Sequence, residues 1–204
     1  MASHHHALGT VALLSMIYLG DYDDGGPGIT MHDLDFSNRR QGHYYFFYEN
    51  NRDNHPWKYV LLHPGTQVFM SVCPTFAGRI VRGNPAYNLD GSALHNLGTW
   101  IEGDVSLLEG CDGAALLAAT DGSGVLTGFS DDIITGAPYA ALAAKSDGSA
   151  TLAKTVGDDA SWVAAQYELG LLDPTTQAFI VQAYKPVIAT RNGRWDLSLY
   201  LGTY

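Results

Sequence analysis

Four carboxylates stand close together in residues 98–113, at Glu102, Asp104, Glu109 and Asp112. The first half of this stretch alternates as a β-strand does, and its second half carries the glycines of a turn. Acidic side chains at strand ends and turns, beside a cysteine, are suited to line a cleft. The alternative is that they are solvated turn carboxylates, as surface Asp and Glu usually are.

The chemistry open to such a group depends on how its carboxyl groups ionise. Hydrolysis of a glycosidic bond needs two carboxyl groups with different pKa values, about 5–10 Å apart. Carboxylates that stay ionised instead accept hydrogen bonds, for example from sugar hydroxyls. Arg79 and Arg82 precede the acidic stretch.

Other catalytic signatures are absent from the sequence. It has no nucleophile elbow, no His-Glu-x-x-His segment and no dinucleotide-binding fingerprint. Residues 21–28 open like a calcium loop, but the twelfth position is His32 and not the bidentate Glu that calcium requires. His32, Asp33 and Asp35 form a small polar cluster that fits a turn as well as a metal site. We expect no cofactor and no metal.

Length and composition narrow the class of protein. A chain of 204 residues fits one domain with a real core. Many glycines (23) and tyrosines (12) favour short strands joined by tight turns. The formal charge of −10 argues against nucleic acid as a partner, because a binder must neutralise phosphates with Lys and Arg. We expect a monomer without a membrane span.

Short apolar segments broken by Pro and Gly predict strands along most of the chain. Two hairpins are expected, with turns at Asp121–Gly124 and Asn192–Gly193. The first joins residues 114–119 to 125–129, and the second joins the last two predicted strands. The other strands are expected at residues 43–48, 57–62, 66–72, 78–82, 176–184, 186–190 and 194–200.

One helix is expected near residues 158–171, where apolar residues recur at helical spacing. Asp158 or Asp159 serves as its N-cap, and Pro174 follows its end. The fold class is therefore mostly β: an antiparallel β-sandwich with one short helix, as a single β-rich domain over residues 21–204.

Residues 1–20 and the two cysteines bear on the compartment. The apolar run of residues 7–19 has the length of a secretory signal, with a core strand or frayed terminus as the alternative. Cys73 and Cys111 either pair in an oxidising compartment or remain two buried thiols. We expect a secreted, extracellular protein in which they form a disulfide.

The middle of the chain resembles the thaumatin-like (osmotin-type) family over roughly residues 43–113. Residues 64–72 have its Pro-Gly turn and alternating strand, and residues 76–82 are similar to its Gly-Arg-Ile-x-x-Arg segment. Thr99–Glu102 is similar to the family's strand that ends in a cleft glutamate. Asp104–Gly110 is similar to its Asp-Val-Ser-Leu-Val-Asp-Gly segment.

This resemblance implies a β-sandwich whose acidic cleft receives a β-glucan. The implied ligand-binding residues are Arg82, Glu102, Asp104, Glu109 (where the family has Asp) and, for stacking, Trp100. Arg82 would hold the carboxylates ionised, which favours binding over catalysis.

We therefore expect a secreted defence protein that binds a polysaccharide or cell-wall glycan. Two alternatives remain open: a structural or host-interaction β-sandwich without a small-molecule site, and a weak β-1,3-glucanase.

Overall fold

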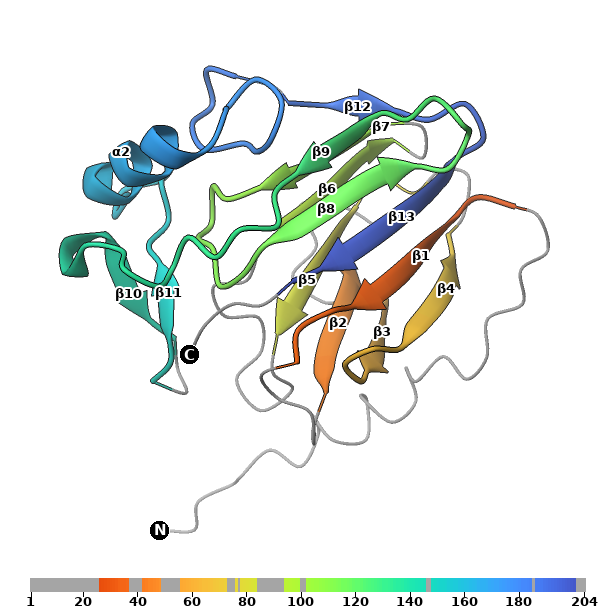
Figure 1. Cartoon of the computed structure of the whole chain (residues 1–204), viewed down its shortest axis with the longest axis horizontal. Helices are drawn as coiled ribbons and strands as arrows, with labels where there is room; N and C mark the ends of the chain where they lie inside the picture. The colour runs from red at the N-terminus through yellow and green to blue at the C-terminus, as the bar shows by residue number, and fades with distance from the viewer. Residues whose placement is uncertain are drawn as a thin grey trace, which may run out of the picture.

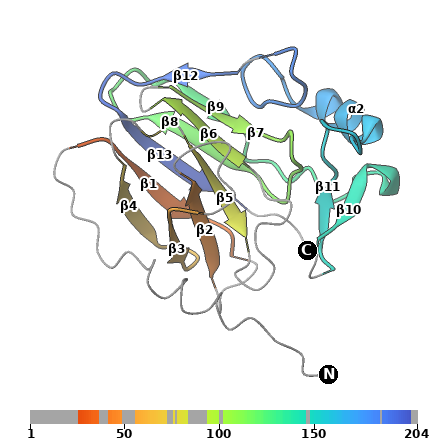
Figure 2. The ribbon, with the colours of Figure 1, turned by 180° about the vertical axis from the view of Figure 1, so that it is seen from behind.

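The computed structural model describes residues 26–36, 42–48, 56–72, 76, 78–83, 94–99, 102–145, 148–184 and 186–200. Two sheets of short strands lie face to face in this part of the chain (Figures 1 and 2). A helix and a small hairpin lie at one end of the sheets.

The first sheet has the order β4-β1-β13-β8-β9. All its neighbours are antiparallel except β1 and β13, which run parallel although they come from opposite ends of the described chain. Its strands are β1 (Gly28–Asp33), β4 (Gln67–Ser71), β8 (Ala115–Ala119), β9 (Leu126–Gly128) and β13 (Arg194–Leu199).

The second sheet is antiparallel throughout, in the order β12-β7-β6-β5-β2-β3. The register of β6 against β7 shifts between Asn96 and Thr99, because β6 has one more residue than β7 between the pairs Asn96–Asp104 and Thr99–Glu102. Its strands are β2 (His43–Tyr48), β3 (Lys58–Leu62), β5 (Arg79–Gly83), β6 (Leu94–Thr99), β7 (Glu102–Ser106) and β12 (Ile188–Ala189).

The core lies between the two sheets. Because successive strand residues point to opposite faces, alternate residues of the central strands face the other sheet, and most of those described are apolar. These side chains are buried and include Ile29, Met31, Tyr45, Phe47, Ile80, Val105, Leu117, Trp195 and Leu197.

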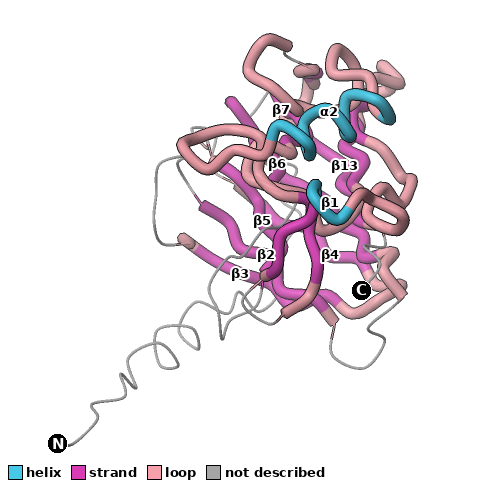
Figure 3. The backbone as a smooth tube through the Cα atoms, turned by 90° about the vertical axis from the view of Figure 1, so that its left-hand side faces the viewer, coloured by secondary structure: helices cyan, strands magenta, loops and turns pink. Residues whose placement is uncertain are grey.

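Helix α2 (Trp162–Leu171), the short 3-10 turn η1 (Tyr139–Ala141) and the hairpin of β10 (Leu142–Ala144) with β11 (Ala150–Leu152) lie at one end of the sandwich (Figure 3). The predicted helix is confirmed, but its predicted cap is wrong. The N-cap is Ser161, whose Oγ accepts a hydrogen bond from the backbone N–H of Ala164 at 3.1 Å.

The mostly β, antiparallel sandwich is confirmed, as is the hairpin of β8 and β9. The hairpin predicted at Asn192–Gly193 is wrong, because β12 and β13 pair in different sheets. The turn therefore passes the chain from one sheet to the other. Residues 176–184 do not form the predicted strand; they are mainly turns, with a single bridge from Phe179 to Ser106.

Several predictions fall on residues 1–25, Cys73 and Trp100, which lie outside the described residues. Cys111 is described, and it is a free, buried thiol that donates to the carbonyl oxygen of Gly113 at 3.1 Å. The predicted disulfide is therefore not seen. Within the described ranges, no helix has the length and apolar character needed to cross a membrane.

Candidate functional site

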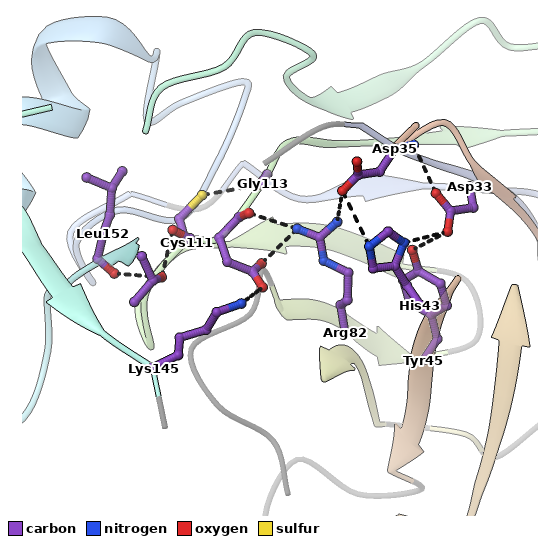
Figure 4. A network of polar contacts seen from close by, with 11 residues as sticks. Asp33, Asp35, His43, Tyr45, Arg82, Cys111, Gly113, Lys145 and Leu152 are labelled. Atoms are coloured by element: carbon purple, nitrogen blue, oxygen red, sulfur yellow. Dashed lines mark hydrogen bonds and ion pairs between the residues drawn. The ribbon is translucent and has the colours of Figure 1, made fainter. Parts of the chain in front are cut away.

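Arg82 lies inside the sandwich. It is two residues beyond Ile80 on β5, so both side chains share the face that meets the other sheet. Its Nη1 donates to Oδ2 of Asp35 at 3.2 Å, and its Nη2 donates to Oδ1 of Asp112 at 3.2 Å and to the Asp112 carbonyl oxygen at 2.8 Å (Figure 4). The guanidinium thus joins two buried carboxylates.

The network continues from Asp35 to β1 and β2. Nδ1 of His43 lies 2.8 Å from Oδ2 of Asp33, and its Nε2 lies 3.6 Å from Oδ2 of Asp35 (Figure 4). The hydroxyl of Tyr45 donates to Oδ2 of Asp33 at 3.3 Å. Burial is the main reason that the pKa of Tyr45 is raised well above its ordinary value.

At the other end, Nζ of Lys145 donates to Oδ2 of Asp112 at 3.0 Å. Three carboxylates therefore meet two permanent cations and one imidazole in a region closed to solvent. Removing one member of such a buried ion-pair network strongly lowers the stability of the fold. This indicates a structural role for the network. Among the described residues, no group of His, Cys, Asp and Glu is arranged to hold a metal ion.

Glu102 and Asp104 lie on the opposite face of the same sheet from Arg82. Both are out of phase with Val105, the core residue of β7. Across the sheet, Asp104 is in register with Asn96, which is in register with Arg79. The structure therefore brings Glu102 and Asp104 together on the outer face, with Arg79, and does not bring Arg82 to them.

Asp104 is buried although it lies on this outer face, whereas Glu102 is exposed. Oδ2 of Asp104 has no hydrogen-bond partner among the residues that the structure describes. Burial raises the pKa of the Asp104 carboxyl from 3.8 to about 7, because the charged form is poorly solvated. At neutral pH this group holds its proton part of the time.

Glu109 lies at a third place, in the turn after β7. The backbone N–H of Thr155 donates to the Leu108 carbonyl oxygen at 3.0 Å, so residues 154–161 run beside this turn. Lys154 forms an ion pair with Asp159. That contact is the main reason that the pKa of Lys154 is raised, and the charges of Glu109 and Asp158 add to it.

The same segment leads directly into α2. The backbone N–H of Ser161 donates to the Lys154 carbonyl oxygen at 2.8 Å, and the next residue is Trp162, whose side chain is 71% exposed. We call Glu109, Lys154, Asp159 and Trp162 the Trp162 surface. Tyr139, 93% exposed, lies on η1, which packs against α2.

The sequence analysis therefore identified only some of the residues that form the buried network and the Trp162 surface. It named Asp112 without a role and did not assign His43, Lys145, Glu168 or Trp162 to any site. One signal was available: Asp33, Arg82 and Glu168 each occupy the apolar phase of their strand or helix, where a polar residue indicates a buried contact. The chain matches no family model and no curated protein.

Replacing Arg82 by Ala should lower the free energy of unfolding by about 3–5 kcal/mol, because Asp35 and Asp112 lose their shared cation while remaining buried. Urea denaturation measures this. Arg79→Ala is the matched control: its guanidinium lies over the Tyr48 ring at 4.1 Å on the outer face, and its loss should cost about 1 kcal/mol. Equal small losses for both variants would contradict a structural role for the network.

Asp104→Asn should flatten the pH dependence of stability. The folded protein keeps a proton on Asp104 up to about pH 7, whereas the unfolded chain releases it near pH 4. The stabilisation that comes from this proton is therefore fully present below pH 4. As the pH rises from 4 to 7, the free energy of unfolding falls by about 1.4 kcal/mol per pH unit. Urea denaturation at pH 4, 5.5, 7 and 8 should show that slope in the wild type and a smaller one in the variant. The same slope in both proteins would refute this account.

Proposed function

We propose that this protein is a secreted, thaumatin-like β-sandwich that binds a neutral glycan of the β-glucan class through the Trp162 surface. The observation that carries the proposal is the 71% exposure of Trp162 at the start of α2, directly after the segment that carries the ion pair of Lys154 with Asp159. Helix α2 exposes Val163 and Leu171 as well as Trp162, and groups of exposed apolar side chains mark sites where a ligand or partner binds.

The chemistry of these side chains fits a neutral sugar polymer. An indole offers an apolar face with an N–H at its edge, which suits the C–H face of a pyranose ring. Carboxylates accept hydrogen bonds from hydroxyls, and the Lys154 ammonium donates them. The net charge of −10 disfavours acidic polymers through long-range repulsion.

The surface is held in place before any ligand binds, which lowers the entropic cost of binding. Ser161 caps α2 and fixes its first turn. Gly157 has φ of +91°, a conformation that lets residues 155–159 fold back so that Lys154 meets Asp159. Binding without catalysis needs no more than this rigid arrangement.

The resemblance of residues 43–113 to thaumatin-like proteins supports the glycan class and the extracellular location. The two-sheet sandwich is compatible with it. The alternative is that the protein has a structural or host-interaction role. In that case Trp162 would contact another protein, and the chain would not be retained on a glycan.

A weak β-1,3-glucanase is the second candidate, and one observation favours it. Glu102 and Asp104 are two residues apart on one face of β7, so their Cα atoms are about 7 Å apart. One is exposed, and the other has its pKa raised to about 7, as an acid–base pair requires. Release of reducing ends by the wild type and not by Glu102→Gln would favour hydrolysis.

Trp162→Ala should reduce retention on insoluble β-1,3-glucan at least about tenfold, because stacking of an exposed aromatic side chain contributes about 1.5 kcal/mol or more. The melting temperature should stay nearly constant, since little of this side chain is buried. A pull-down with quantified bound and free protein measures the retention.

The matched control is Trp57→Ala. Trp57 is also exposed, but it precedes β3, at the opposite edge of the second sheet from β12 and β7. Retention should remain at the wild-type level in this variant. Equal loss in both variants, or no retention by the wild type, would contradict the proposed site.

A further inference from the structure

Helix α2 carries a buried carboxyl group that no described part of the binding surface uses. Glu168 is 0% exposed, and neither Oε1 nor Oε2 has a hydrogen-bond partner within the described part of the chain. It lies one turn beyond Ala164, on the buried face of the helix. Native proteins rarely leave a buried polar side chain unpaired, so this position calls for an explanation.

Among the described residues, the groups around Glu168 offer it no compensating charge. From η1 comes Tyr139, which is exposed, and on α2 itself the other titratable side chain is the half-buried Tyr167. Burial raises the pKa of the nearby Cys111 thiol, and a negative charge on Glu168 adds to that increase. Beyond the thiol, Asp112 and Arg82 are paired with each other.

The protonated form of Glu168 is therefore the one that suits the docked helix. Burial alone raises the pKa of its carboxyl from 4.5 to about 8. An undocked helix would expose the carboxyl to water and return it to ordinary behaviour. The folded arrangement thus retains a proton between about pH 4.5 and pH 8 that the undocked arrangement releases.

We propose that Glu168 makes the docking of α2 sensitive to pH: the neutral acid allows the helix to lie on the core, and the carboxylate favours its release into water. Because Trp162 begins the same helix, release of α2 displaces the Trp162 surface. The device therefore favours ligand binding under acidic conditions. Its effect on binding rests on the proposed function, whereas the docking of α2 does not.

The magnitude follows from linkage. One proton taken up on docking changes the docking equilibrium constant about tenfold per pH unit between pH 4.5 and 8, in favour of the docked helix as pH falls. Above pH 8 both arrangements carry the carboxylate, and the dependence ends.

Amide hydrogen exchange tests this directly. In the full-length protein, the protection of α2 amides, corrected for the intrinsic exchange rate, should fall about tenfold per unit from pH 5 to pH 7. Amides of β13, a central strand, exchange only through larger openings, so they should be better protected than α2 at every pH; these openings expose Asp104 as well as Glu168, so their protection should fall with pH at least as steeply. In Glu168→Gln the pH dependence of α2 should vanish. Glu168→Leu, which is apolar, provides the same comparison if the amide destabilises the fold.

Asp131→Asn is the matched control, since Asp131 is an exposed carboxylate in the loop after β9; it should behave as the wild type. Protection in α2 that is independent of pH in the wild type, or an α2 pH dependence that is unchanged in Glu168→Gln and Glu168→Leu, would overturn the proposal. Retention on β-1,3-glucan at pH 5 and pH 8 separates the two proposals. Retention that falls with pH in the wild type and not in Glu168→Gln supports both. If exchange in α2 depends on pH but the protein is retained on the glucan at neither pH, the pH-sensitive docking of α2 stands and the proposed glycan binding is refuted.

Discussion

The structure depends on one buried guanidinium. Arg82 holds Asp35 from the end of β1 and Asp112 from the connection after β7, and so joins the two sheets at one end of the sandwich. Burying charged groups costs desolvation free energy, which is offset only when the ion pairs and hydrogen bonds between them have good geometry. Here each of the two carboxylates that pair with Arg82 has a second neighbour: the Lys145 ammonium lies beside Asp112, and the His43 imidazole lies beside Asp35. The arrangement is directional, unlike the apolar core, and it therefore fixes how the connections leave the sheets.

The connections at this end build the exposed surface in sequence. Asp112 is adjacent to Cys111, whose backbone N–H and carbonyl pair with Leu152 at the end of β11. From β11 the chain passes through residues 154–161, which lie against the turn of Glu109, to the cap of α2 at Ser161. A buried ion-pair network, a β-bridge and a helix cap thus connect the sandwich to the start of α2, where Trp162 is exposed. Asp104 and Glu168, two buried carboxyls without a hydrogen-bond partner in the described ranges, lie outside this chain of contacts and make stability depend on pH.

The parts predictable from sequence were those with local periodicity. The strand of residues 43–48, the hairpin of β8 and β9 and the helix near 158–171 each have a pattern that short-range physics explains. The parallel pairing of β1 with β13 joins residues more than 160 positions apart, and no local pattern encodes it. Without that pairing, Asp33 and Asp35 read as a surface turn, and Arg82 as a cleft residue. The members of the acidic stretch lie apart because pleating sends Asp104 outward on β7 while the chain turns before Glu109.

The central claim is that a neutral glycan binds at the Trp162 surface. Amide hydrogen exchange with and without a β-1,3-glucan hexasaccharide, at pH 5, tests it most directly. The account predicts added protection in residues 108–109 and 154–165, with β7 at Glu102–Asp104 unchanged. Protection confined to Glu102–Asp104, or none at a saturating concentration of the hexasaccharide, would contradict it.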